Sequence, residues 1–240
     1  MKFATALLFV ASSVAVVSAH IGLLYPVPRG GYGTKAFDGR IHTFIGYKDK
    51  VHSQTFPCGG YPMGPVTPLK ANQLIDVRFY ASSLSKAQLK TQPKLGQGKT
   101  VSQARHGGGT CEFSLSYDGG KTYGLIGRYT KTCPDAYFKW PIRIPSDVPS
   151  CSKKGQCLFV WSWTANILPQ YYHNCADITL QGVNGADPKK AFKKSIAIVD
   201  FGSKKKNVKA PGDGHSHTPS TGPSSAEKAL NSKSKKLSSI

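Results

Sequence analysis

The sequence predicts an all-β chain folded as an antiparallel β-sandwich, with long loops and a disordered C-terminal tail. Short strand-like runs recur after residue 70, and turn signals separate them. No helical pattern of the kind that links parallel strands lies between these runs. Residues 201–240 contain almost no large apolar side chains, so they cannot bury enough surface to offset the entropy of ordering.

The run NQLIDVRFYA (72–81) shows the clearest strand pattern. Ile75, Val77 and Phe79 alternate with a second set that includes Asp76 and Arg78. A period of two is typical of a strand with one buried face. Residues before this strand are rich in Gly, Pro and Tyr and predict long loops with short extended pieces.

Residues 111–127 predict a β-hairpin. Phe113, Leu115 and Tyr117 share one face, and Asp118-Gly119-Gly120 then supplies the positive φ that a tight turn needs. Residues 187–195 could form one or two helical turns. Such a set of short strands is typical of an immunoglobulin- or fibronectin-like sandwich. Three further strands are expected, in FKWPIRIP (138–145), CLFVWSWTA (157–165) and NCADITLQG (174–182).

Residues 1–19 have the features of a secretory signal peptide. Lys2 precedes an apolar run, and Val17 and Ala19 place small residues at the −3 and −1 positions. The run is shorter than the roughly 20 apolar residues of a membrane span, which disfavours a membrane anchor. Cleavage after Ala19 would make His20 the first residue of a secreted, extracellular chain, with one domain over residues 20–200.

The chain is strongly basic, with 32 Lys and Arg against 12 Asp and Glu and a net charge of +20. Loss of Lys2 with the leader would leave +19. This charge indicates an anionic partner, or it serves only solubility. Secretion favours acidic polysaccharide, cell wall or a membrane surface over nucleic acid. Six cysteines in an exported chain predict three disulfides, for which 15 connectivities are possible.

Two of the seven histidines are well placed to bind a metal. His20 at a mature N-terminus would offer both an α-amine and an imidazole nitrogen. His106 stands before three glycines, which permit a sharp turn at the edge of a strand. Three nitrogen ligands favour Cu(II). Packing or surface exposure is expected for His173, surface roles for His42 and His52, and no defined role for His215 and His217.

The run PQYYHNCADITL (169–180) could complete this site. Strand alternation places Tyr171 and His173 on one face and Gln170 and Tyr172 on the other. On that second face the phenol oxygen could approach a metal axially, and the amide could hydrogen-bond a bound oxygen species.

The order of these motifs resembles the fungal lytic polysaccharide monooxygenases, most closely the chitin-active auxiliary activity family 11. The resemblance spans most of residues 20–182. The motifs that carry it are His20 followed by YPVPR (25–29), FPCGGY (56–61), HGGGTCEFSLSYDGGKTY (106–123), CPDAYFKWPIRIPSDVPS (133–150) and YHNCADITL (172–180).

The resemblance implies that His20, His106 and Tyr172 hold one copper ion per chain, with Gln170 beside Tyr172. It also implies two disulfides, and the third joins two cysteines that bracket a short loop. The three pairs are Cys58–Cys175, Cys111–Cys133 and Cys151–Cys157.

Three positions beside the expected copper site bear on the substrate. Gln170 stands where the chitin-active family usually has Glu, whereas Gln is typical of the cellulose-active fungal relatives. Ala104 matches the small residue that crowds the open axial side of copper in the chitin branch. Arg105 would place a positive charge beside the metal, on the face that meets substrate. Chitin is therefore the first expected substrate and cellulose the second.

The implied reaction is oxidative cleavage of an insoluble β-1,4-linked polysaccharide. An external electron donor reduces Cu(II) to Cu(I), and hydrogen peroxide or oxygen then supports hydroxylation at C1 or C4. The chain is expected to act as a monomer, without nucleic acid and without a membrane span. Two alternatives are a copper-binding cell-surface protein that cleaves no polysaccharide, and a cell-wall lectin in which His20 is incidental.

Overall fold

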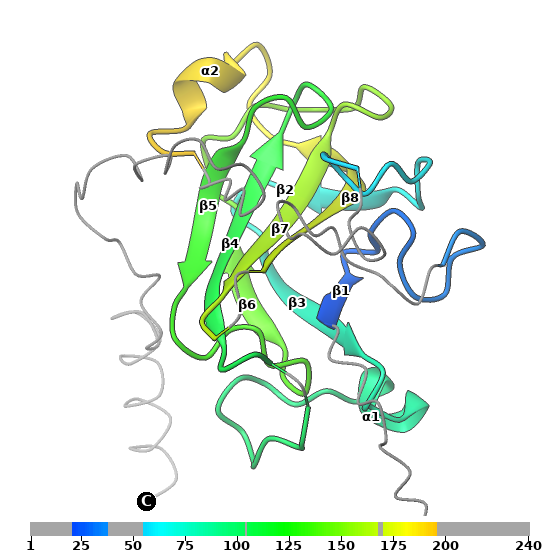
Figure 1. The fold of residues 1–240 in the computed structure, drawn as a ribbon. Coiled ribbons are helices and arrows are strands. Elements are labelled where there is room, and N and C mark those ends of the chain that lie inside the picture. The colour runs from blue at the N-terminus through cyan, green and yellow to red at the C-terminus, as the bar shows by residue number, and fades with distance from the viewer. Residues whose placement is uncertain (1–20, 38–54, 104, 168–169, 196–240) are drawn as a thin grey trace, which may run out of the picture.

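The computed structural model describes residues 21–37, 55–103, 105–167 and 170–195 (Figure 1). Several sequence-based expectations fall outside these residues. They concern the signal peptide, the copper ligand His20, the axial-side residue Ala104, and the tail at 201–240.

Two β-sheets form the described part of the chain, so the predicted all-β sandwich is confirmed (Figure 1). The smaller sheet has three strands in the order β1-β3-β6. Both of its strand pairs are antiparallel. Its strands are β1 (Ile21–Tyr25), β3 (Leu74–Ala81) and β6 (Trp140–Arg143).

The larger sheet has five strands in the order β2-β8-β7-β4-β5. Its pairs are antiparallel except that β2 lies parallel to β8. The expectation of a wholly antiparallel sandwich is therefore wrong at this edge, where most of the domain separates the two strands and provides the crossover that a parallel pair needs. Its strands are β2 (Thr67–Lys70), β4 (Gly109–Ser116), β5 (Gly124–Tyr129), β7 (Leu158–Ala165) and β8 (Tyr171–Gln181).

The core lies between the two sheets. Ile75, Val77 and Phe79 on β3 are buried there, as their alternation predicts. Strands β4, β7 and β8 are buried on both faces. One face of these strands points to the core, and the opposite, outer face is covered by a second apolar cluster that includes Cys58 and Tyr123. The neighbouring runs CLFVWSWTA and YYHNCADITL therefore lack a simple polar–apolar alternation.

The predicted hairpin is present as β4 and β5, joined by a loop over residues 117–123. Gly119 and Gly120 have φ values of 75° and 91°. The Asp118 carboxylate accepts hydrogen bonds from Ser116 and Thr122 within this loop. The loop is therefore longer than the expected tight turn.

Two short helices complete the described elements. The sequence analysis did not predict α1 (Lys86–Lys90), which begins with a capping box between Ser85 and Gln88. The expected turn near residue 190 is α2 (Pro188–Ala191), capped by Asp187. Among the described helices, none has the length and hydropathy needed to cross a membrane.

The structure contains three disulfides, and their pairing is the one that the resemblance implied. The paired cysteines are separated in sequence by very different numbers of residues: 117 for Cys58–Cys175, 22 for Cys111–Cys133 and 6 for Cys151–Cys157. The first joins the loop on the outer face of the larger sheet to β8. The second ties β4 to the segment that leads to β6.

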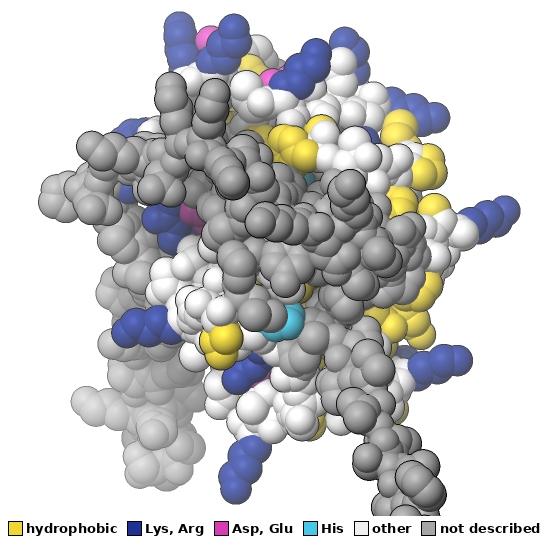
Figure 2. All heavy atoms as spheres, viewed as in Figure 1, with side chains coloured by type: hydrophobic (Ala, Val, Ile, Leu, Met, Phe, Trp, Pro, Cys, Tyr) yellow, Lys and Arg dark blue, Asp and Glu magenta, His cyan; other side chains and the backbone are white. Residues whose placement is uncertain are grey.

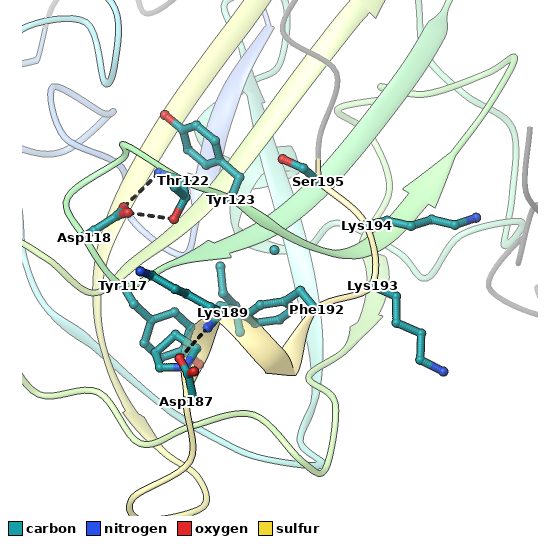
Figure 3. A pocket seen from close by; sticks show the side chains of 13 residues that line it. Tyr117, Asp118, Thr122, Tyr123, Asp187, Lys189, Phe192, Lys193, Lys194 and Ser195 are labelled. Atoms are coloured by element: carbon teal, nitrogen blue, oxygen red, sulfur yellow. Dashed lines mark hydrogen bonds between the residues drawn. The ribbon is translucent and has the colours of Figure 1, made fainter. Parts of the chain in front are cut away.

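A cavity of about 540 Å³ lies beside α2 (Figure 3). Tyr117 and Phe192 form part of its apolar lining, and Lys189 and Lys193 lie around it. The Leu125 N–H donates to Lys194 O (2.9 Å), so the segment after α2 covers the edge of β5. The cavity lies at the end of β4 that is remote from Gly109, and it is separate from the site described next.

Candidate functional site

His106 lies in the turn that leads into β4. Its φ of 47° is in the left-handed region, which costs a non-glycine residue about 1–2 kcal/mol. The surrounding backbone holds this conformation. His106 O accepts from the Ile167 N–H at 3.1 Å, and Gly108 O accepts from the Asn166 N–H at 3.0 Å. The turn is thus fixed against the end of β7.

The glycines after His106 permit close approach as well as a turn. A Cβ on Gly108 would lie 2.1 Å from Lys131 O, and one on Gly109 would lie 2.1 Å from Thr164 O. Both distances are far inside van der Waals contact. Glycine is therefore required at positions 108 and 109 of the HGGG motif, because neighbouring backbone occupies the space that a side chain would need.

The imidazole of His106 stacks on an aromatic pair from the larger sheet. Its centroid is 5.7 Å from the Trp163 ring and 6.4 Å from the Tyr172 ring, with interplanar angles of 20° and 29°. Trp163 and Tyr172 are opposite each other on β7 and β8, and their rings are 4.4 Å apart. The structure thus brings His106 and Tyr172 together at one end of the sandwich.

Gln170 and Tyr172 lie on the same face of the chain, as the alternation predicts. The Tyr172 hydroxyl donates to Gln170 Oε1 at 2.7 Å, and both side chains are buried. Burial raises the pKa of Tyr172, so the phenol is neutral at physiological pH. Its proton is directed toward Gln170.

Tyr171 and His173 lie on the opposite face, beside the outer apolar cluster. His173 is fully buried, and its ring centroid is 4.8 Å from Phe56 and 5.3 Å from Tyr123. Burial lowers the pKa of His173 to about 3, so its imidazole is neutral. The expected packing role of His173 is what the structure shows.

Strand β1 brings the start of the described chain toward this site. Ile21 pairs with Ala81 on β3, and the Leu23 N–H donates to Asn174 Oδ1 on β8 at 2.8 Å. Asn174 is two residues beyond Tyr172 on the same strand. Asn174 is not among the residues predicted for the site, although a polar residue within a buried strand is a signal for such a role.

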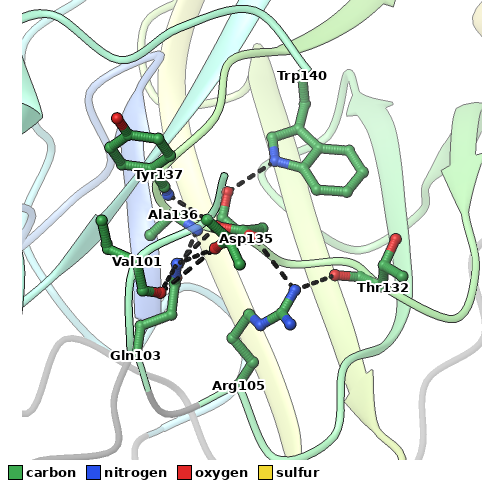
Figure 4. A network of polar contacts seen from close by, with 9 residues as sticks. Val101, Gln103, Arg105, Thr132, Asp135, Ala136, Tyr137 and Trp140 are labelled. Carbon is green, nitrogen blue, oxygen red and sulfur yellow. Dashed lines mark hydrogen bonds and ion pairs between the residues drawn. The ribbon is translucent and has the colours of Figure 1, made fainter. Parts of the chain in front are cut away.

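Arg105 does not present an unpaired charge. Its guanidinium forms an ion pair with Asp135 at 3.1 Å and lies 3.4 Å from Thr132 O (Figure 4). The expectation of a positive charge aimed at substrate is thus modified, because a carboxylate that is itself buried offsets that charge. No local pattern in the sequence predicts the role of Asp135, because its side-chain partners are about 30 residues away in sequence.

The donors of the described site suit copper. The His106 imidazole and the Tyr172 phenol are nitrogen and oxygen donors, and imidazole is a ligand for copper as well as for zinc, iron and nickel. Among the residues that the structure describes, no three His, Cys, Asp or Glu side chains gather around one metal position. His106 is the one described residue of the two expected histidine ligands, since His20 is outside the described ranges.

The two-layer fold, with a stacked histidine–tyrosine pair at one end, defines a β-sandwich protein whose site lies at the edge of its sheets.

Comparison with known proteins identifies the family. The chain is 31% identical over 179 residues to the AA11 family lytic polysaccharide monooxygenase A of Aspergillus fumigatus. The matched region covers 72% of this chain and 70% of the relative. The chain belongs to the AA11 family of lytic polysaccharide monooxygenases, which are copper-dependent oxidative enzymes. No family model matches the chain.

Proposed function

We propose that this chain is a secreted monooxygenase that cleaves an insoluble β-1,4-linked polysaccharide by oxidation at C1 or C4. Chitin is the first proposed substrate and cellulose the second. The observation that carries the proposal is the pairing of His106 with buried Tyr172, whose rings are 6.4 Å apart. Family membership supports the same chemistry.

The proposed site holds one copper ion per chain through His20, His106 and Tyr172. His20 would contribute its α-amine and imidazole, His106 its imidazole, and Tyr172 its phenol oxygen. His20 is bonded to Ile21, and adjacent Cα atoms are about 3.8 Å apart. The contacts of β1 with β3 and β8 bring the first described residues to the strand that carries Tyr172, which supports this part of the proposal. When bound, copper supplies one-electron reduction and the activation of hydrogen peroxide or oxygen.

The side chains around this ion have distinct tasks in the proposal. Trp163 stacks on His106 and limits rotation of the imidazole. The Tyr172 hydroxyl donates a hydrogen bond to Gln170 Oε1, which would hold the orientation of the phenol oxygen beside the metal. The Gln170 amide N–H₂ is the donor that would orient an oxygen species at the site. Ala104 is the proposed small residue on the open axial side.

The surface charge is consistent with an acidic wall polymer near the substrate. Figure 2 shows Lys and Arg side chains spread around one face, where few Asp and Glu side chains are visible. We propose that this basic surface brings the enzyme to chitin that lies beside anionic polymers. Binding to isolated chitin should then be weaker than binding to wall material, and the difference should shrink with added salt.

A substrate panel tests the proposed function. The mature chain beginning at His20 is loaded with copper and incubated with β-chitin or cellulose, ascorbate and hydrogen peroxide. Mass spectrometry should detect oxidised oligosaccharides, and the type of oxidation identifies C1 or C4. A His106→Ala variant serves as the copper-site control. Tight copper binding without products would support the copper-handling alternative, and absence of copper binding would leave a lectin.

A further inference from the structure

The buried carboxylate of Asp135 is the centre of a polar network, and the side chains that donate to it are half-buried or exposed (Figure 4). It accepts hydrogen bonds from the Thr100 hydroxyl and the Gln103 amide, each at 2.6 Å. It also accepts from the Tyr137 N–H at 3.0 Å and from Arg105 Nη1 at 3.1 Å. Three of these four donors belong to the loop that ends at His106.

The backbone that carries Asp135 is itself well anchored. Cys133 is joined to Cys111 on β4, and Trp140 Nε1 donates to Asp135 O at 2.9 Å. The Ala136 N–H donates to Gln103 Oε1 at 2.7 Å, which makes the link to the loop reciprocal. Asp135 therefore connects a fixed segment to residues 100–103 and 105, which lie outside the described helices and strands.

The network reaches His106 through the residue immediately before it. Arg105 is held at its side chain by Asp135, and its carbonyl accepts the Gly108 N–H at 2.7 Å. This second bond closes the turn around His106, whose left-handed backbone persists only where its surroundings impose it. Loss of the carboxylate would leave several donors unsatisfied and release the loop on one side of this turn.

We propose that Asp135 is a positioning residue for His106. Its carboxylate holds Thr100, Gln103 and Arg105 and thereby sets the orientation of the His106 imidazole toward copper. The inference rests on the proposed copper site. Groups that orient metal ligands typically change metal affinity 10- to 100-fold when they are removed.

The variant Asp135→Asn tests this role, because it keeps the size of the side chain and removes its charge and one acceptor. A matched control is Glu112→Gln. Glu112 is also a buried carboxylate paired with an arginine, Arg128. Glu112 on β4 lies opposite Ser162 on β7, which in turn lies opposite His173 on β8. This cross-strand row faces the outer side of the sheet, away from the His106 ring. Loss of the Glu112 carboxylate therefore disturbs a comparable ion pair at a distance from the proposed copper site.

Three properties are measured for each variant: Cu(II) affinity by calorimetry, the Cu(II) electron paramagnetic resonance spectrum, and the melting temperature of the metal-free protein. Asp135→Asn should bind copper about tenfold or more weakly and show an altered spectrum. Glu112→Gln should lower the melting temperature but keep both the wild-type affinity and the wild-type spectrum.

Milder variants keep the inference testable if Asp135→Asn does not fold. Thr100→Val and Arg105→Gln each remove one donor, and Arg105→Gln should weaken copper binding more because Arg105 adjoins His106. Unchanged affinity and spectrum in folded Asp135→Asn, or in both milder variants, would overturn the positioning role. An equal loss in Glu112→Gln would overturn it as well. A wild-type chain that binds no copper would instead refute the proposed function on which the inference rests.

Discussion

Tyr172 and Gln170 form a buried unit, in which the phenol donates to the amide oxygen at 2.7 Å while its ring stacks on Trp163. Tyr171 lies between them in sequence but points to the opposite face of the sheet, where it lies near His173. Adjacent tyrosines of equal burial are therefore placed in two unrelated environments. This arrangement offers an internal control for the role of either phenol.

Replacing Tyr172 with Phe should alter copper binding, whereas Tyr171→Phe should not. Each change removes a buried hydroxyl and should cost about 1–3 kcal/mol of stability, because a buried partner loses its hydrogen bond. Only Tyr172→Phe removes the proposed axial oxygen, so only it should change the copper spectrum and lower the yield of oxidised oligosaccharides. Spectra of both copper-loaded variants, recorded beside the wild type, provide the measurement. Identical spectra for the two variants would exclude Tyr172 as a ligand.

One additional residue before His20 should abolish tight copper binding. The added residue converts the α-amine of His20 into an amide, which no longer offers a lone pair to the metal at neutral pH. Calorimetric titration of the mature chain and of a chain with one extra N-terminal glycine measures the difference. Equal affinity in the two chains would show that the amine is not a ligand.

His173 should make the fold less stable as the pH falls below about 6.5, the ordinary pKa of histidine. Burial lowers its pKa to about 3 in the folded state, so between these values the unfolded chain binds a proton that the folded chain does not. The contribution of His173 to the free energy of unfolding is therefore fully present above about pH 6.5, the ordinary pKa of histidine. As the pH falls from there toward the pKa of His173 in the folded state, this contribution decreases by at most about 1.4 kcal/mol per pH unit.

The variant His173→Phe isolates this contribution because it removes the titrating group and retains a ring against Phe56. Denaturant unfolding between pH 7 and pH 4 should give a shallower loss of stability in the variant than in the wild type. The comparison uses the slope with pH, so a change in absolute stability does not affect it. Parallel slopes would contradict the assignment of a neutral buried imidazole.

Gly108→Ala should be much more destabilising than Gly185→Ala. The two glycines have similar φ values, 77° and 73°, so the backbone penalty of about 1–2 kcal/mol is shared. A Cβ on Gly108 would collide with Lys131 O, whereas nothing lies within 4 Å of one on Gly185. We expect about 3 kcal/mol or more for Gly108→Ala, measured by chemical denaturation. Equal losses would mean that the turn before β4 can move aside.

Local pattern was sufficient to predict most of the strands. The alternation of β3 and the glycine-rich connection of the β4–β5 hairpin both predicted the observed elements. The placement of Gln170 with Tyr172 follows from the same period of two. Such features depend on neighbours in sequence, which is why a single chain reveals them.

The relationships that were missed depend on residues far apart in the chain. The parallel pairing of β2 with β8 and the bond from Leu23 to Asn174 join segments separated by most of the domain. Asp135 showed no local sign of its role, since its loop partners are about 30 residues earlier. The short helix α1 was missed because its signal, a capping box, spans only four residues.

Strand β1 has a consequence for when the enzyme can acquire its metal. It pairs with β3 in one layer and is bonded to Asn174 of the other, so its position is defined only after both layers have met. A metal site that depends on the residue before Ile21 cannot exist in either sheet alone. A copper site built from that residue and from side chains of the larger sheet would then be complete only after the two sheets have packed together.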